Sequence, residues 1–320
     1  MNKVRKISSI RVEKVAINLG AEIKGVDLAE LDDATFKAIE EALVEHQVLV
    51  FRDQHDLTTE QFIAFGERFG ELSVHPFSPA DPDRPHLIVF DNDENNPPLA
   101  TDVWHSDETF REVPPTATIL RAIEVPRIGG DTLFSSMIAA YDGLNERLKQ
   151  YVSGLEGIHD MKPFRVVFED AENKADLHYF EDVYPMVPHP VVREHPVSKK
   201  KVLFVNPQFT IKIKGMGEAE SESLLNLLFD QAKVPEYQYR HHWEAGTVVV
   251  WDNRSVQHYA VHDYYPHRRL MERVTVKGTD RPHMAEAPVD AASLKSRKSK
   301  FPDDPKIKHG GHAPKKLATR

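Results

Sequence analysis

Apolar residues in the first fifty-odd positions switch between the spacing of strands and that of helices. Residues 10–28, IRVEKVAINLGAEIKGVDL, predict one or two short strands interrupted at a glycine. Residues 31–47 carry apolar side chains at helical spacing, and Asp32 or Asp33 is available as an N-cap. The apolar run VLVFRDQ, residues 48–54, then predicts a buried strand.

A second helix is predicted over residues 57–72, because Thr58 and Gln61 fit a capping box and three phenylalanines share one face. Beyond Gly70 the pattern changes to short apolar runs separated by turn residues. Helices are predicted at 138–151 and 217–232. Strands are predicted at 87–90, 103–110, 117–123, 131–136, 189–196, 201–206 and within 246–278.

This succession predicts a mainly β fold with helices, of the α+β class. Strict strand–helix alternation and a glycine-rich phosphate loop are both missing, which argues against a doubly wound parallel sheet. Many short strands with helices at one side favour a double-sheet jelly roll of the cupin-like kind, with flanking helices. We expect a single domain over residues 1–280, followed by a basic, flexible tail over 281–320.

Charge and composition narrow the class of protein. The net charge of −9 hides a basic end, because residues 295–320 hold nine Lys or Arg against two Asp. The acidic remainder argues against a nucleic-acid partner. No apolar run has the length of a membrane span, so we expect no membrane partner and a cytoplasmic location. Cysteine is absent, and any metal site must therefore use His, Asp or Glu.

Two distant segments offer such ligands. In a strand over DVWHSDETF, His105 and Asp107 would project to one side and Ser106 to the other. His258 follows the apolar run TVVVW. Two imidazoles and one carboxylate with open positions form the facial triad of non-haem Fe(II) oxygenases. The alternative is a local hydrogen-bonded His–Asp pair without a metal.

Arg269 stands eleven residues after His258, in the predicted strand RRLMERVTVKG. Alternation places Arg269 and Arg273 on one face and Leu270 and Val274 on the other. An arginine inside a barrel needs an anion, and its planar fork matches a carboxylate. The far carboxylate of 2-oxoglutarate would satisfy Arg269 and leave Arg273 for a second anion. The alternative is an exposed strand with solvated arginines.

Several blocks in this order resemble one enzyme family. They include GAEIKGVDL, HQVLVFRDQ, FGELSVHP, WHSDETF, PRIGGDTLFSS, HPVVREHP, LFVN and WDNRSVQHYAVHDYYPHRRLMERVTVKG. Over residues 10–280 the chain resembles the taurine dioxygenase / 2,4-D dioxygenase (TauD/TfdA) family of Fe(II)- and 2-oxoglutarate-dependent oxygenases. The resemblance implies a double-stranded β-helix, with Fe(II) as cofactor and 2-oxoglutarate and O₂ as co-substrates. By this resemblance, the catalytic iron ligands are His105, Asp107 and His258. The residues that bind 2-oxoglutarate are Thr132 and Arg269.

The same resemblance implies the substrate pocket. His75 and Arg273 match residues that contact a sulfonate, with a capped loop histidine and a structural strand arginine as alternatives. Phe209 matches an aromatic wall, or is plain core. Three positions depart from the taurine-type pattern, which has Tyr, Asn and Val where this chain has Ser78, Thr101 and Glu108. Glu108 could be solvated, pair with a neighbouring cation or meet a substrate ammonium group.

The expected reaction is hydroxylation of a small anion next to its leaving group. A sulfonate such as taurine would give an aldehyde and sulfite, together with succinate and CO₂ from 2-oxoglutarate. An alkyl sulfate ester, an aryloxyalkanoate or another small carboxylate could take its place. A zinc-type metallo-hydrolase on the same three ligands and a catalytically silent binding protein are the alternatives from other classes. By resemblance, we expect a homodimer or homotetramer.

Overall fold

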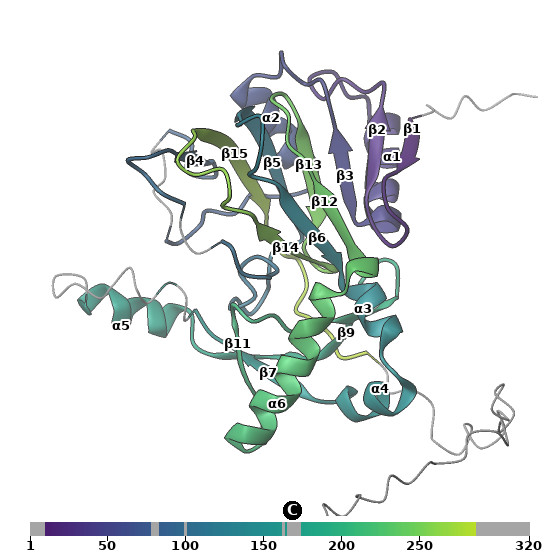
Figure 1. The fold of residues 1–320 in the computed structure, drawn as a ribbon, viewed down its shortest axis with the longest axis vertical. Coiled ribbons are helices and arrows are strands. Elements are labelled where there is room, and N and C mark those ends of the chain that lie inside the picture. Colours follow the sequence, from purple (N-terminus) through teal and green to yellow (C-terminus); the bar gives the residue numbers. More distant parts are fainter. Residues whose placement is uncertain (1–9, 78–82, 99–100, 162–163, 165–173, 286–320) are drawn as a thin grey trace, which may run out of the picture. The chain divides into compact units, whose positions relative to one another are not determined.

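The structure is a computed structural model that describes residues 10–77, 83–98, 101–161, 164 and 174–285 (Figure 1). Its largest sheet has seven strands. Neighbouring strands are antiparallel except β2 and β3. Their order is β1 (Arg11–Lys14), β2 (Ala21–Lys24), β3 (Val48–Phe51), β13 (Val248–Asp252), β5 (Ala117–Glu124), β15 (Arg269–Val276) and β4 (Ile88–Asn92).

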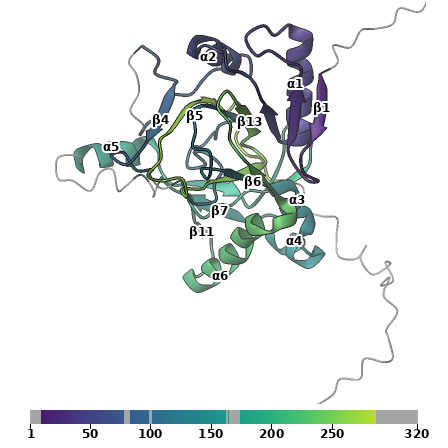
Figure 2. The same cartoon turned by 45° about the horizontal axis from the view of Figure 1, so that its top comes forward.

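A smaller sheet packs against the inner face of the large one. Its order is β12 (Gln238–His241), β6 (Thr132–Ser136) and β14 (Val256–Ala260). In Figure 2, β4, β5, β13 and β6 lie around a common centre. One apolar cluster fills the space between the sheets, with Trp251 and Met271 from the large sheet and Phe134 and Val256 from the small one. Side chains of two sheets that meet in one core define the jelly roll that the sequence predicts.

Helices α1 (Asp33–His46) and α2 (Thr59–Glu67) cover the outer face of the large sheet. Alternation along β13 explains the two faces, because Val248 and Val250 point to the helices while Val249 points inward. The predicted caps are confirmed: Asp32 accepts a hydrogen bond from the Thr35 amide, and Thr58 forms a capping box with Gln61.

A third group of elements packs around its own apolar cluster. The predicted helix over 138–151 is two helices, because Leu144 is extended and Asn145 caps the second one through the Leu148 amide. The elements are α3 (Met137–Gly143), α4 (Glu146–Val152), β9 (Val192–Glu194), β10 (Lys201–Leu203), β11 (Thr210–Ile213), α6 (Glu218–Phe229), and the 3₁₀ helices η2 (Asp230–Lys233) and η3 (Pro235–Tyr237). Strands β7 (Glu156–His159) and β8 (Val187–Pro190) form a sheet with β11, and α5 (Lys174–Val183) contributes Phe180 to a separate aromatic cluster.

All described residues belong to one unit, Met1–Glu286. The predicted division into a domain over 1–280 and a tail over 281–320 stays a prediction, since residues 286–320 lie outside the described part of the chain. Within the described residues, no helix combines the length and the apolar character that crossing a bilayer requires.

Candidate metal centre

The segment that carries His105 and Asp107 is not the strand that its composition predicts. His105 forms a single antiparallel bridge with His258, through reciprocal backbone hydrogen bonds of 3.0 and 2.7 Å. Residues 107–110 then turn, and Glu108 adopts a left-handed φ of 49°. The Asn253 side chain takes the place of a strand partner, because its amide accepts from Asp107 N–H at 2.7 Å and donates to Asp107 O at 2.9 Å. A turn, and not strand alternation, therefore aims the two side chains together.

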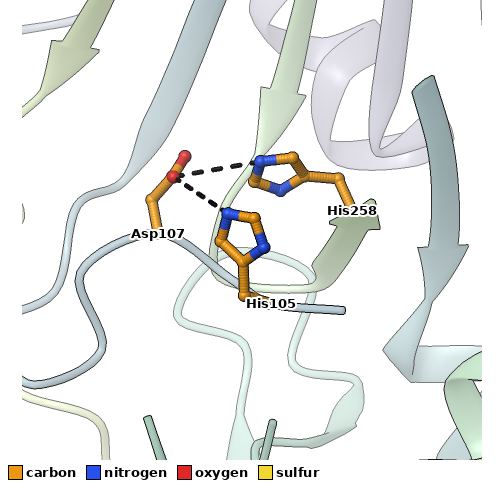
Figure 3. Close-up of side chains that lie close together, drawn as sticks. All are labelled: His105, Asp107 and His258. Carbon is orange, nitrogen blue, oxygen red and sulfur yellow. Dashed lines mark ion pairs between the residues drawn. The ribbon is translucent and has the colours of Figure 1, made fainter. Parts of the chain in front are cut away.

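His105, Asp107 and His258 converge at one point (Figure 3). The Asp107 Oδ1 atom lies 3.8 Å from His105 Nε2 and 3.9 Å from His258 Nε2. Only 4%, 3% and 7% of these residues is exposed, respectively. Strand β14 places His258 within the small sheet, one short turn after β13. Two imidazole nitrogens and one carboxylate oxygen in a buried cluster form a donor set suited to a divalent transition metal.

The imidazoles are in the state that a metal requires. His105 Nδ1 lies 2.7 Å from the Val103 carbonyl oxygen, which can only accept, so Nδ1 donates and Nε2 keeps its lone pair. Burial lowers the pKa of His105, and burial together with the nearby His105 lowers the pKa of His258 to about 3. Both rings are therefore neutral at physiological pH.

Asp107 is held as a carboxylate. Burial alone would raise its pKa, but Arg273 and the two imidazoles outweigh that effect and keep the pKa of Asp107 below its usual range. The Thr118 hydroxyl donates to Oδ2 at 2.7 Å, and Oδ1 therefore faces the histidines. Arg273 Nη2 lies 3.2 Å from the same Oδ1. A metal ion would share this oxygen with the arginine.

Thr118→Val should weaken metal binding by roughly 10- to 100-fold, the usual effect of losing a group that orients a ligand. Thr118 points inward from β5, and its hydroxyl selects the Asp107 oxygen that remains for the metal. Titration of the metal-free protein with Co(II) or Fe(II) would measure the change. Thr116→Val is the matched control, because the Thr116 hydroxyl bonds only the exposed Lys277 carbonyl. Equal affinities in both variants would contradict the assigned role.

Arg269 begins β15 and is buried, with 7% of its surface exposed. Its guanidinium carbon lies 5.8 Å from the Trp243 ring centroid and 5.6 Å from that of Tyr264. Its Nε has no hydrogen-bond partner in the described part of the chain, which also places no carboxylate in ion-pair contact with it. Burial lowers the pKa of Arg269 to about 10, so the group stays cationic. A buried cation in this state is suited to an anionic ligand.

Thr132, the first residue of β6, lies on the same side of the site. Its hydroxyl accepts a hydrogen bond of 2.9 Å from Trp243 Nε1, so one indole contacts both predicted 2-oxoglutarate residues. Gly130 has a φ of 70°, and an added Cβ there would approach Arg269 Cδ and Nε to 3.3 Å. Gly130, the second glycine of GGDT, therefore leaves room for the Arg269 side chain.

Comparison with known proteins identifies the family. The model of the family described as "Taurine catabolism dioxygenase TauD, TfdA family" matches residues 11–275. The chain belongs to the TauD/TfdA dioxygenase family. The expected fold and the expected enzyme class, an oxidoreductase of the dioxygenase type, are thereby confirmed.

Relatives of this TauD/TfdA chain act on different anions. It is 37% identical to the alpha-ketoglutarate-dependent sulfate ester dioxygenase of Pseudomonas putida, over 83% of this chain and 89% of that enzyme. It is 36% identical to the (S)-phenoxypropionate/alpha-ketoglutarate-dioxygenase of Sphingobium herbicidovorans, over 81% and 92%. The crystal structure of a taurine dioxygenase from Burkholderia xenovorans superposes with a TM-score of 0.74 at 35% identity, over 88% and 93%.

Two predicted substrate residues of this TauD/TfdA member, Arg273 and His75, lie near Asp107. Arg273 contacts Asp107 and donates from Nε to Thr275 Oγ1 at 3.1 Å. His75 Nδ1 accepts from the Phe77 amide at 3.2 Å. Burial, followed by the charge of Arg273, lowers the pKa of His75 to about 3, so its ring is neutral. The structure thus brings Arg273 and His75 close to the predicted metal ligand Asp107.

An aromatic cluster borders the ligands. Phe209 is buried, and its ring centroid lies 6.4 Å from that of His105. Phe209 is thus part of the core, and its role as an aromatic wall of the substrate pocket stays a prediction. Its cluster consists of Phe77, Phe110, Met161, Phe164, Phe180, Tyr184 and Phe209. An apolar part of a substrate would find its contacts on this side.

The three positions that depart from the taurine-type pattern, Ser78, Thr101 and Glu108, differ in what the structure shows of them. Glu108 is 2% exposed and pairs with Arg111 at 2.5 Å, so the solvated interpretation is wrong and pairing with a neighbouring cation is correct. Thr101 is hydrogen-bonded to His262 Nε2 at 2.9 Å, and its predicted pocket role stays a prediction. Ser78 lies outside the described residues.

Several residues of the site were not predicted from the sequence. Asn253 follows β13 directly in the block WDNRSVQH, and this position after a strand is the one available signal. Thr118, Trp243, Tyr264 and Arg111 belong to ordinary-looking segments. Their roles arise from contacts between separate segments, such as those of Trp243 with Thr132 and of Arg111 with Val74, and from the packing of Tyr264 on Arg269 across a turn.

Proposed function

We propose that this chain is an Fe(II)- and 2-oxoglutarate-dependent dioxygenase that hydroxylates a small organic anion next to its leaving group. The convergence of buried His105, Asp107 and His258 is the observation that carries the proposal. Two imidazoles and one carboxylate on one side of a metal leave three positions for exogenous ligands, as the reaction requires. When bound, Fe(II) would supply the O₂ chemistry that no side chain can perform.

Arg269 would hold the distal carboxylate of 2-oxoglutarate. A guanidinium fork matches a carboxylate in bidentate fashion, and the flanking rings of Trp243 and Tyr264 restrict its orientation. The Thr132 hydroxyl accepts from Trp243 and can donate its own proton to the same carboxylate. The absence of an intramolecular anion at Arg269, within the described residues, supports this assignment.

Arg273 would bind the anionic head of the substrate, with the neutral His75 ring as an additional hydrogen-bond partner. The aromatic cluster around Phe209 would hold the organic body and exclude water. Together these groups place a carbon atom beside the metal and keep protein side chains away from it. On a sulfonate, hydroxylation of that carbon is followed by loss of sulfite and formation of an aldehyde, while 2-oxoglutarate gives succinate and CO₂.

The related sulfate ester and phenoxypropionate enzymes support two further substrate classes for this site, alkyl sulfates and aryloxyalkanoates. A zinc hydrolase on the same ligands finds no support, because such an enzyme would have no use for a buried arginine suited to a dicarboxylate. A cytoplasmic location and a dimeric or tetrameric state stay predictions.

The test is a turnover assay with Fe(II), 2-oxoglutarate and air on an alkyl sulfonate, an alkyl sulfate and an aryloxyalkanoate. We expect one class to give succinate in equal amount to released sulfite, sulfate or phenol. Omission of O₂ or of 2-oxoglutarate should stop both products. Release of the leaving group without either co-substrate would establish hydrolysis and overturn the proposal.

A further inference from the structure

Glu108 is a buried carboxylate that the proposed reaction does not use. It directly follows Asp107, its φ is 49°, and 2% of its surface is exposed. A left-handed backbone is unfavourable for glutamate, and burial of a carboxylate is costly unless cations compensate it. A charged Glu108 at this position, next to the proposed metal ligand Asp107, therefore costs substantial folding free energy.

Two arginines flank this carboxylate. Arg111 Nε lies 2.5 Å from Glu108 Oε2, and Arg273 Nη2 lies 3.9 Å from Oε1. Arg111 is held in place by the Val74 carbonyl at 3.3 Å and by the Tyr184 ring, whose centroid is 5.2 Å from its guanidinium carbon. Oε1 is buried and finds no hydrogen-bond donor among the described residues.

The charges around the proposed substrate head sum to one positive charge. Arg273 and Arg111 are cationic, and Glu108, which pairs with Arg111 at 2.5 Å, removes one of their charges. His75 adds no charge, because its Nδ1 accepts a hydrogen bond from the Phe77 amide and therefore carries no proton. The proposed metal centre adds nothing, because a divalent ion and Arg269 balance Asp107 and doubly charged 2-oxoglutarate. A singly charged substrate would therefore leave the buried site neutral.

We propose that Glu108 is a specificity-determining residue that restricts the substrate to singly charged anions. The inference rests on the proposed function and names the charge class of its substrate. Sulfonates, sulfate monoesters and carboxylates carry one charge and fit. Phosphate monoesters carry close to two charges at pH 8, since their second pKa is about 6. Their second charge would be buried beside Glu108 Oε1 without a cation, which is a repulsive element of the kind that gives specificity.

The experiment compares hexyl sulfate with hexyl phosphate, which share a chain and differ in charge. Full-length protein is loaded with Fe(II) and 2-oxoglutarate without oxygen, and each Kd is measured by calorimetry at pH 8. We expect the wild type to bind hexyl sulfate at least about tenfold more tightly. Glu108→Gln should raise the affinity for hexyl phosphate relative to hexyl sulfate by roughly 10- to 100-fold, because like-charge juxtaposition at a buried site is costly. Glu108→Val should shift the ratio in the same direction.

Glu272→Gln is the matched control. Glu272 also forms a buried pair with an arginine, at 2.5 Å from Arg121, but it extends from the outer face of β15 and should leave the ratio unchanged. A ratio that stays at the wild-type value in both Glu108 variants, or a loss of both ligands together, would overturn the inference. In that case hexyl sulfate binding by the wild type still leaves the proposed function standing. Failure of the wild type to turn over any of the three substrate classes of the turnover assay would instead count against the proposed function.

Discussion

Replacing Asp107 with alanine should reduce 2-oxoglutarate consumption to the background rate and weaken metal binding by more than 100-fold. Loss of a group that only orients a ligand costs 10- to 100-fold, and Asp107 is the one carboxylate of the proposed triad. Its Oδ1 is the atom that both imidazoles face, so two neutral nitrogens alone would remain. Metal titration and a succinate assay measure the two effects separately.

The fold should survive this change, because Arg273 retains Glu108 as a neighbouring acid. A thermal melt followed by circular dichroism would verify it. Asp230→Ala is the control: this exposed residue pairs with Lys233 at 2.7 Å, and surface pairs of this kind contribute little. Undiminished turnover in folded Asp107→Ala protein would remove the proposed metal site.

Arg269→Met should raise the KM for 2-oxoglutarate by roughly 30-fold to several thousand-fold. Removing one partner of a buried charged pair costs about 2–5 kcal/mol, and each 1.4 kcal/mol is a factor of ten. Methionine fills a similar volume between Trp243 and Tyr264 without the charge. The metal-free protein should lose no stability, because Arg269 is buried without an ion pair to any described residue.

Arg268→Ala provides the comparison, because this neighbouring arginine points outward and pairs with Asp91 and Glu124. Its KM for 2-oxoglutarate should equal that of the wild type. Steady-state kinetics at saturating substrate, together with a denaturant titration of each protein, give both quantities. If Arg269→Met bound 2-oxoglutarate normally, the co-substrate would have to be anchored elsewhere.

Local sequence signals predicted most of the fold, because the interactions they report are themselves local. Asp32 and the Thr58–Gln61 pair cap their helices through residues three positions away. The alternation of β15 also holds, since Met271 and Val274 belong to different clusters on the two faces of the sheet. Leu270 is an exception to this pattern because it is only half-buried. It lies where the register between β15 and β5 shifts, between Leu270 and Met271.

The prediction of a strand over residues 103–110 failed for a nonlocal reason. The aromatic and β-branched residues there have strand propensity, but Asn253 binds the backbone of Asp107 and stabilises a turn. The structure nevertheless brings the His105 and Asp107 side chains together, because a turn and a strand can both bring neighbouring side chains to one side. Thr118 and Trp243 could not be found in the same way, since a hydrogen bond across two segments leaves no periodic pattern in either one.

The reciprocal backbone hydrogen bonds between His105 and His258 have a consequence for loading of the metal. These main-chain contacts hold the two remote segments together without involving the imidazole side chains. The incoming ion then meets a rigid pair of donors and does not have to recruit them from mobile loops, which keeps the entropic penalty of coordination small. The rate of metal binding should thus be limited by access of the ion to the protein interior and by release of its hydration water.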